Sequence, residues 1–124
     1  MGAEPKRPAE GVTLLEREDR AGVLVLTVAV LQIDDTNADR LSAALEEAAS
    51  AIPEPRVVLN LERVAYLSSA ALGVFIAYRQ KLAREGGKLR LCGLQPNIAQ
   101  VFRLTKLVRA FDIRPDLGSA LEAF

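Results

Sequence analysis

Two adjacent serines, Ser68 and Ser69, are the side chains best placed for chemistry in this chain of 124 residues. They follow a β-rich run at residues 56–61 and precede a pattern of helical spacing from about residue 70 to residue 84. Serine is a preferred helix N-cap, so one hydroxyl is expected to accept a hydrogen bond from an amide of the next turn. A phosphate attached here would lie beside amides that stabilise anions, and it would add roughly −1.5 to −2 charges. The pair predicts a helix cap, a phosphorylation switch or both, and the small apolar residues at 70–73 would let another protein approach closely.

Catalytic alternatives have little support, because the chain contains no histidine. This absence removes the commonest general base, the Ser-His and Cys-His nucleophile pairs and most zinc sites. The single cysteine, Cys92, lies in an alternating strand pattern with no base or second cysteine to activate it, which favours the role of a small hydrophobic residue. Gly86-Gly87-Lys88 lacks the other residues of a phosphate-binding loop and is predicted to be a turn. The sequence predicts neither an enzyme nor a bound cofactor.

Two charged clusters have a structural interpretation. The first is acidic and consists of Asp34, Asp35 and Asp39. It lacks the glycine and the distal glutamate of a calcium-binding loop, so we expect the start of a helix, with Asp35 or Thr36 as N-cap, and no metal site. The second cluster is basic and recurs at threefold spacing: Arg103, Lys106 and Arg109. It could form a face for an acidic partner, but a solvated helix end is favoured.

Composition narrows the class of protein. Half of the residues are hydrophobic and 26% are charged, which excludes a disordered chain and suits one domain with its own core. Lys plus Arg and Asp plus Glu number 16 each, so net charge gives no reason to expect nucleic acid as a partner. The most apolar run, residues 21–31, is shorter than the roughly 20 residues that span a bilayer, and it begins too late for a signal peptide. We expect a cytoplasmic protein without membrane insertion, with a flexible tail at residues 1–11.

Strand and helix patterns alternate from residue 12 onwards. Strands are predicted at residues 12–17, 23–30, 56–61, 88–93 and 110–113, and helices at about residues 41–49, 70–84, 97–104 and 116–123. The first two strands are close enough for an antiparallel hairpin, whereas the others require right-handed crossovers. We therefore predict an α/β fold with a mixed β-sheet of about four to five strands and four helices packed on it. The segment from Asn60 to Ser69 is then a candidate site, because function in such sheets lies beyond the carboxyl ends of the strands.

The stretch from Val57 to Val74 resembles the signature of STAS domains, specifically of bacterial anti-anti-sigma factors. That family typically has a hydrophobic strand, Asp-Leu-Ser, and a few residues later Asp-Ser-Ser-Gly-Leu-Gly. The corresponding residues here read Asn60-Leu61-Glu62 and Ser68-Ser69-Ala70-Ala71-Leu72-Gly73. The resemblance continues through Gly86-Gly87 and residues 94–102, and it implies a STAS-type sandwich over residues 12–124. Asn60 and Ser68 stand where the family usually has Asp, and Ala71 stands where it has Gly.

The resemblance implies an anti-sigma factor antagonist that regulates transcription by partner switching. The partner would be an anti-sigma factor with serine kinase activity, and binding it would free the sigma factor. Ser69 matches the serine that the kinase phosphorylates to end this contact, and a phosphatase would reset the cycle. The residues implied in partner binding are Asn60, Ser68, Ser69, Ala71, Leu72, Gly73, Asp34 and Asp35.

Two other functions stay open on the sequence. The first is a STAS subunit that is never phosphorylated and scaffolds a larger signalling assembly or a transporter, which fits the altered residues around Ser69. The second is direct binding of a small ligand such as a nucleotide or a lipid, for which the sequence offers no motif.

Overall fold

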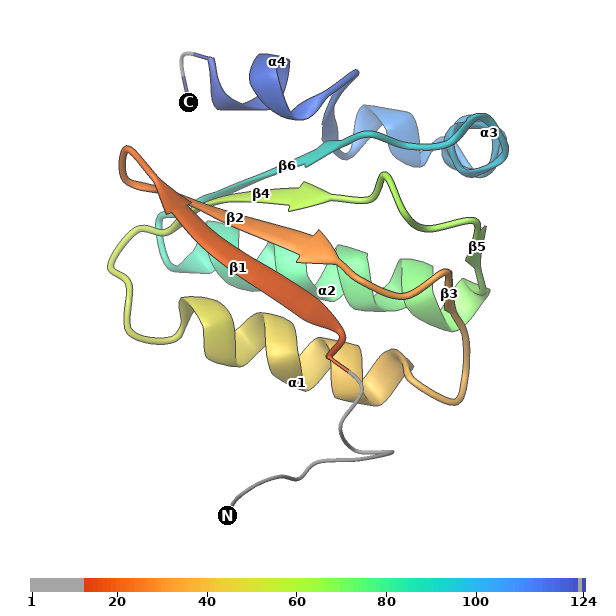
Figure 1. Ribbon diagram of the computed structural model, residues 1–124, viewed down its shortest axis with the longest axis horizontal. Coiled ribbons are helices and arrows are strands. Elements are labelled where there is room, and N and C mark those ends of the chain that lie inside the picture. Colours follow the sequence, from red (N-terminus) through yellow and green to blue (C-terminus); the bar gives the residue numbers. More distant parts are fainter. Residues whose placement is uncertain (1–12, 123) are drawn as a thin grey trace.

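Residues 13–122 and residue 124 are described by the computed structural model, and they fold around one five-stranded β-sheet (Figure 1). Its strands are β1 (Leu15–Arg20), β2 (Val23–Val28), β4 (Arg56–Asn60), β6 (Lys88–Cys92) and β7 (Asp112–Arg114). A separate pair of short strands consists of β3 (Gln32–Ile33) and β5 (Tyr66–Leu67). The helices are α1 (Ala38–Ala49), α2 (Ser69–Arg84), α3 (Pro96–Leu104), the 3₁₀ helix η2 (Leu107–Arg109) and α4 (Leu117–Leu121). This architecture confirms the predicted α/β class.

The sheet has the strand order β1-β2-β4-β6-β7. β1 and β2 form the predicted antiparallel hairpin, whose tight turn places Ala21 and Gly22 at φ angles of 51° and 86°. The other neighbours are parallel, and the chain passes through α1 from β2 to β4 and through α2 from β4 to β6. Parallel neighbours need such crossovers, so the carboxyl ends of β2, β4 and β6 lie along the same edge of the sheet.

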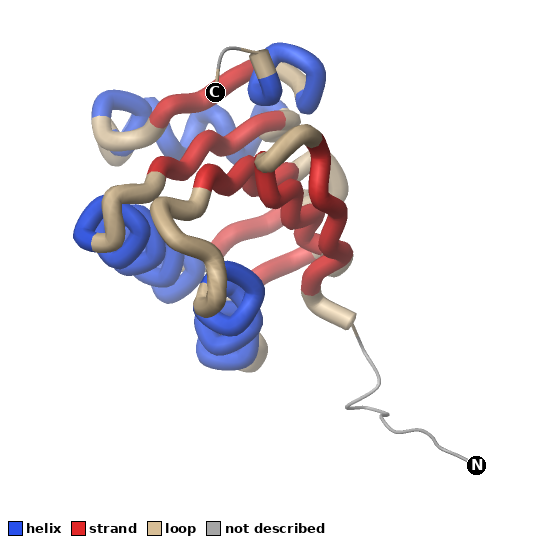
Figure 2. Tube along the Cα trace, turned by 90° about the vertical axis from the view of Figure 1, so that its left-hand side faces the viewer, coloured by secondary structure: helices blue, strands red, loops and turns tan. Residues whose placement is uncertain are grey.

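The helices cover the sheet on both faces. α1 and α2 lie against one face and α4 lies against the other (Figure 1), and Figure 2 shows the strands as the layer between them. Alternate strand residues face the two sides. The larger apolar core, toward α1 and α2, includes Leu26, Leu59, Leu91 and Phe75, and the smaller core, toward α4, consists of Val23, Val58, Cys92 and Ala120. Burial on both faces explains why these strands read as continuous hydrophobic runs.

Several boundaries differ from the sequence prediction. The second strand ends at Val28 because the chain bends there toward β3, and the last strand begins at Asp112 because η2 occupies the residues before it. The N-cap of α1 is Asn37 rather than Asp35 or Thr36. The predicted tail at residues 1–11 and the predicted domain start at residue 12 lie outside the described residues. Within the described part of the chain, no helix is long and apolar enough to cross a membrane.

Candidate functional site

The short strands β3 and β5 bring two loops of the candidate site together. They pair in parallel, with Gln32 opposite Tyr66 and Ile33 opposite Leu67. The amide of Ser68 continues this pairing by donating to the carbonyl of Ile33 over 2.9 Å. The acidic loop that leaves β3 at Asp34 therefore starts beside the N-terminus of α2, at the end of the molecule where Figure 1 shows β3 and β5.

Ser68 is the N-cap of α2. Its backbone is extended, with φ −85° and ψ 171°, and its hydroxyl oxygen accepts a hydrogen bond of 3.2 Å from the amide of Ala71. The carbonyl of Ser68 accepts the first hydrogen bond of the helix from the amide of Leu72. This confirms the prediction that a serine hydroxyl caps the N-terminus of the helix, and it assigns that role to Ser68.

Ser69 is the first residue of α2, and its side chain is exposed. Among the described residues, no side chain or backbone group makes a hydrogen bond to its hydroxyl. The first turn of this 16-residue helix contains no acidic residue, so the partial positive charge of the helix N-terminus is not offset there. Because Ser68 already caps the helix, the Ser69 hydroxyl is free for a reaction or a contact that leaves the cap in place.

The next residues of α2 differ in their exposure. Ala71 is completely buried in the larger core and adopts no positive φ, so its backbone conformation does not require the glycine of the family signature. Leu72 is half-buried and packs against the same core. Gly73 is exposed, and a Cβ atom at its position would meet no atom of the described residues within 4 Å. Of the residues predicted here for partner binding, Leu72 and Gly73 reach the surface and Ala71 does not.

Asp34 and Asp35 lie in a loop held by its own hydrogen bonds. The carboxylate of Asp34 accepts from the amide and hydroxyl of Thr36 and from the side-chain amide of Gln32. The hydrogen bonds from Thr36, followed by the one from Gln32, hold the pKa of Asp34 below its usual range. Asp35 is exposed. In the part of the chain that the structure describes, no three His, Cys, Asp or Glu side chains gather in a group that could hold a metal ion.

Asn60 lies away from this surface, at the end of β4. Asn60 is only 5% exposed, and its Oδ1 atom accepts a 3.2 Å hydrogen bond from the amide of Glu62. Gly93, where φ is +72°, has no Cβ atom, and a Cβ atom placed there would lie only 2.9 Å from the same oxygen. Asn60 therefore shapes the turn that leaves β4, and its side chain makes no hydrogen bond to Ser68 or Ser69.

Two exposed apolar residues near the serines were not predicted from the sequence. Leu31 precedes β3 and is 72% exposed, and Tyr66 lies in β5 and is 53% exposed. The strands beside them are two residues long, too short for an alternating pattern to reveal which side chains are buried. The sequence indicated these two residues only by their positions, since Leu31 stands shortly before the acidic loop and Tyr66 shortly before the two serines.

Comparisons with known proteins give a consistent result. The STAS domain family matches residues 15–120. BtrV of Bordetella bronchiseptica, a protein assigned the role of anti-sigma factor antagonist, is 34% identical over 101 residues, which are 80% of this chain and 86% of BtrV.

Solved structures agree with the sequence comparison. An anti-sigma factor antagonist from Mycobacterium paratuberculosis is 30% identical, with a TM-score of 0.77 over 88% of this chain and 91% of that protein. A STAS domain protein from Planctomyces limnophilus, described as an anti-sigma factor antagonist, is 17% identical, with a TM-score of 0.79 over 88% of this chain and 95% of its own. The second likeness concerns the fold alone.

Proposed function

Because this chain belongs to the STAS domain family, we propose that it is an anti-sigma factor antagonist that works by partner switching. In its unphosphorylated form it binds an anti-sigma factor with serine kinase activity and thereby frees the sigma factor for transcription. The kinase transfers a phosphoryl group from its own ATP to the Ser69 hydroxyl, ADP leaves, and the complex separates. A phosphatase hydrolyses the phosphoserine and restores the binding form.

The observation that carries this proposal is the exposed hydroxyl of Ser69 beside a helix cap supplied by a different residue. Phosphorylation of a capping hydroxyl would compete with the cap, whereas modification of Ser69 leaves the hydrogen bond between Ser68 and Ala71 intact. A dianion placed in a close apolar contact costs several kcal/mol unless it finds new partners. The same contact that binds the unphosphorylated form therefore rejects the phosphorylated one.

The proposed contact surface consists of the exposed and half-exposed residues around Ser69: Leu72, Gly73, Asp34 and Asp35. Ala71 is buried beneath this surface in the larger core, whereas Asn60 lies at the end of β4 and is not part of it. Ser68 replaces the usual acid beside the phosphorylated serine, so a phosphate on Ser69 has one negative neighbour fewer. Asp34 and Asp35 keep the surface acidic and favour a basic region on the partner.

An affinity capture from the lysate of the source organism tests the proposal. The baits are the wild-type protein, Ser69→Ala and Ser69→Asp, with bound proteins identified by mass spectrometry. We expect the wild type and Ser69→Ala to retain an anti-sigma factor with a kinase domain, and Ser69→Asp to lose it. Incubation with ATP and the captured kinase should add one phosphate to the wild type and none to Ser69→Ala.

The matched control is Ser50→Asp, which adds the same charge to an exposed serine at the C-terminal end of α1. This variant should retain the kinase. If all baits bring down the same scaffold or membrane proteins and no kinase, Ser69 is only the first residue of a helix, and the scaffold function replaces partner switching.

A further inference from the structure

A pocket of about 210 Å³ lies at the amino end of β6, between α2 and the residues that enter β7. The sheet narrows here, because the pairing of β6 with β7 begins only at Arg90 and Asp112. Lys88 and Leu89 therefore have no strand neighbour on that side among the described residues. The lining comes from α2, from the start of β6 and from the chain on either side of Phe111: Arg79, Ala83, Gly87, Lys88, Leu89, Ala110 and Asp112.

Two of the lining residues are cations without a partner. Arg79 in α2 and Lys88 in β6 are both exposed, and neither side chain makes a hydrogen bond or an ion pair within the described part of the chain. Lys81 on the same helix differs from them, because it is paired with Glu85 over 2.8 Å. Two like charges that line one pocket repel each other, so an anion bound between them is favourable for both.

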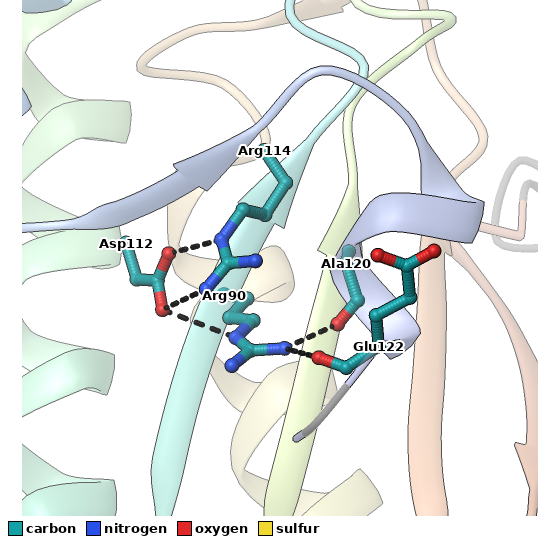
Figure 3. A network of polar contacts seen from close by, with 5 residues as sticks. All are labelled: Arg90, Asp112, Arg114, Ala120 and Glu122. Atoms are coloured by element: carbon teal, nitrogen blue, oxygen red, sulfur yellow. Dashed lines mark hydrogen bonds and ion pairs between the residues drawn. The ribbon is translucent and has the colours of Figure 1, made fainter.

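The carboxylate of Asp112 does not neutralise these two cations. Its Oδ1 atom accepts a 2.7 Å hydrogen bond from Arg114, and its Oδ2 atom accepts a 3.0 Å hydrogen bond from Arg90 (Figure 3). The hydrogen bonds from Arg114 and then from Arg90 hold the pKa of Asp112 below its usual range. With its two partners counted, the carboxylate stands against four cations at this pocket, although the charges of the whole chain balance. The local field therefore favours an anionic ligand.

The rest of the lining is apolar and small. Leu89 is only 7% exposed and closes the pocket toward the core, while Ala83, Gly87 and Ala110 leave the space between the walls open. Pockets for drug-sized ligands measure roughly 300–1,000 Å³, so this one has room only for a smaller molecule. Unpaired cations beside a short apolar wall match a ligand that has one charged group and a small apolar body.

We propose that this pocket binds a small phosphate monoester. A phosphate monoester carries roughly −1.5 to −2 charges at pH 7, which match the two positive charges of Arg79 and Lys88. The guanidinium of Arg79 donates parallel hydrogen bonds to the phosphate and Lys88 supplies a point charge, while the apolar body lies against Leu89. Arg79 lies about 15 Å along α2 from Ser69. The pocket is therefore separate from the proposed contact surface, and its ligand does not depend on partner switching.

An NMR titration of the purified full chain with phenyl phosphate tests the proposal. We expect saturable shifts of the amide signals of Gly87, Leu89 and Ala110, with a dissociation constant of about 1 mM or lower. Benzyl alcohol has the apolar ring without the charge, and inorganic phosphate has the charge without the ring. Each should bind at least about 5-fold more weakly than phenyl phosphate.

Matched variants locate the binding site. Arg79→Gln and Lys88→Gln should each weaken binding of phenyl phosphate by about 5-fold or more, whereas Arg84→Gln, an exposed position of α2 outside the pocket, should change it by less than about 2-fold. Ala83→Leu fills the pocket and should abolish binding, whereas Ala77→Leu at another exposed position of α2 should not. All five side chains are exposed, so the melting temperature should stay that of the wild type.

Three results would overturn the proposal. The first is the absence of saturable shifts at the pocket, including the case in which phenyl phosphate shifts only the basic segment at residues 103–109. The second is equal binding by Arg79→Gln, Lys88→Gln and Arg84→Gln. The third is equal binding of inorganic phosphate and phenyl phosphate, which would show that the pocket attracts anions without recognising the apolar body. None of these results bears on Ser69, and a failed capture of the anti-sigma factor would leave the proposed pocket untouched.

Discussion

At the scale of single residues, Gly73 makes α2 less stable than alanine would, and it leaves the surface beside it open. Glycine within a helix is less favourable than alanine by about 0.5–1 kcal/mol, and no atom in the described part of the chain fills the space beside Gly73. We expect Gly73→Ala to raise the free energy of unfolding by about that amount, measured by urea denaturation. The added methyl group occupies the proposed contact surface, so the affinity for the anti-sigma factor should fall in a calorimetric titration.

Gly118→Ala in α4 is the matched control for Gly73→Ala. A Cβ atom at Gly118 would lie 3.6 Å from the carboxylate of Asp116, an ordinary contact distance. This variant should be as stable as the wild type or more stable and should bind the anti-sigma factor normally. If Gly73→Ala also binds normally, the partner does not approach this turn of α2.

Cys92 is a residue for which burial determines reactivity. It is fully buried in the smaller core, and burial raises the pKa of its thiol to about 11, with smaller contributions from Glu62 and Asp116. We expect a thiol reagent to modify Cys92 at pH 8 only after denaturation. The unfolded pKa is about 8.5, so the protonated thiol stabilises the folded state fully below that pH, and this contribution is lost as the pH rises toward 11. Rapid modification of the native protein would show that the α4 side of the sheet opens readily.

At the scale of elements, α4 depends on one arginine of the sheet. Arg90 in β6 donates to the carbonyls of Ala120 and Glu122, each over 2.8 Å, and to the carboxylate of Asp112 over 3.0 Å (Figure 3). Its guanidinium also lies 4.3 Å from the centre of the Phe124 ring. A helix of five residues is not stable by itself, so these contacts and the smaller apolar core hold it in place.

We expect Arg90→Met to lower the free energy of unfolding by roughly 3 kcal/mol, because buried carbonyls and Asp112 lose a charged donor. Hydrogen exchange should show α4 opening before the rest of the chain. The matched control is Arg114→Met, which removes only the more exposed contact with Asp112 and should cost less than about 1 kcal/mol. Equal losses for the two variants would contradict this role of Arg90.

The elements also show what a single sequence can predict. Long periodic runs, such as the helix that starts after Ser68, carry enough buried positions to be recognised, and their order determined the fold class. β3 and β5 were missed, because two-residue strands exist only through their pairing in space. The proposed role of Ser69 comes from the family signature. The closeness of Asn60 to Gly93 could not be predicted in the same way, because the two residues are distant in the sequence and adjacent only in the fold.

At the scale of the whole molecule, the proposed switch acts on a surface that the core does not need. α2 contributes four residues to the interior, namely Ala71, Phe75, Tyr78 and Leu82, and Ser69 is not among them. The central strands β2, β4 and β6 are buried on both faces, so we expect the close-packed sheet to keep its arrangement when Ser69 is phosphorylated. The proposed release of the partner is therefore local repulsion and not a change of fold.

Ser69→Asp tests this directly through stability. A negative charge at the first position of α2 interacts favourably with the helix dipole, an effect of about 0.3–1 kcal/mol at low ionic strength, and no acidic residue of the first turn opposes it. We expect Ser69→Asp to unfold at the same urea concentration as the wild type or a slightly higher one. The neutral variant Ser69→Asn provides the comparison, and the difference between the two should shrink in about 1 M salt, which screens exposed charges. If Ser69→Asp is instead less stable than Ser69→Asn by more than about 1 kcal/mol, the charge disturbs the fold, and loss of partner binding by this variant would report unfolding instead of a switch.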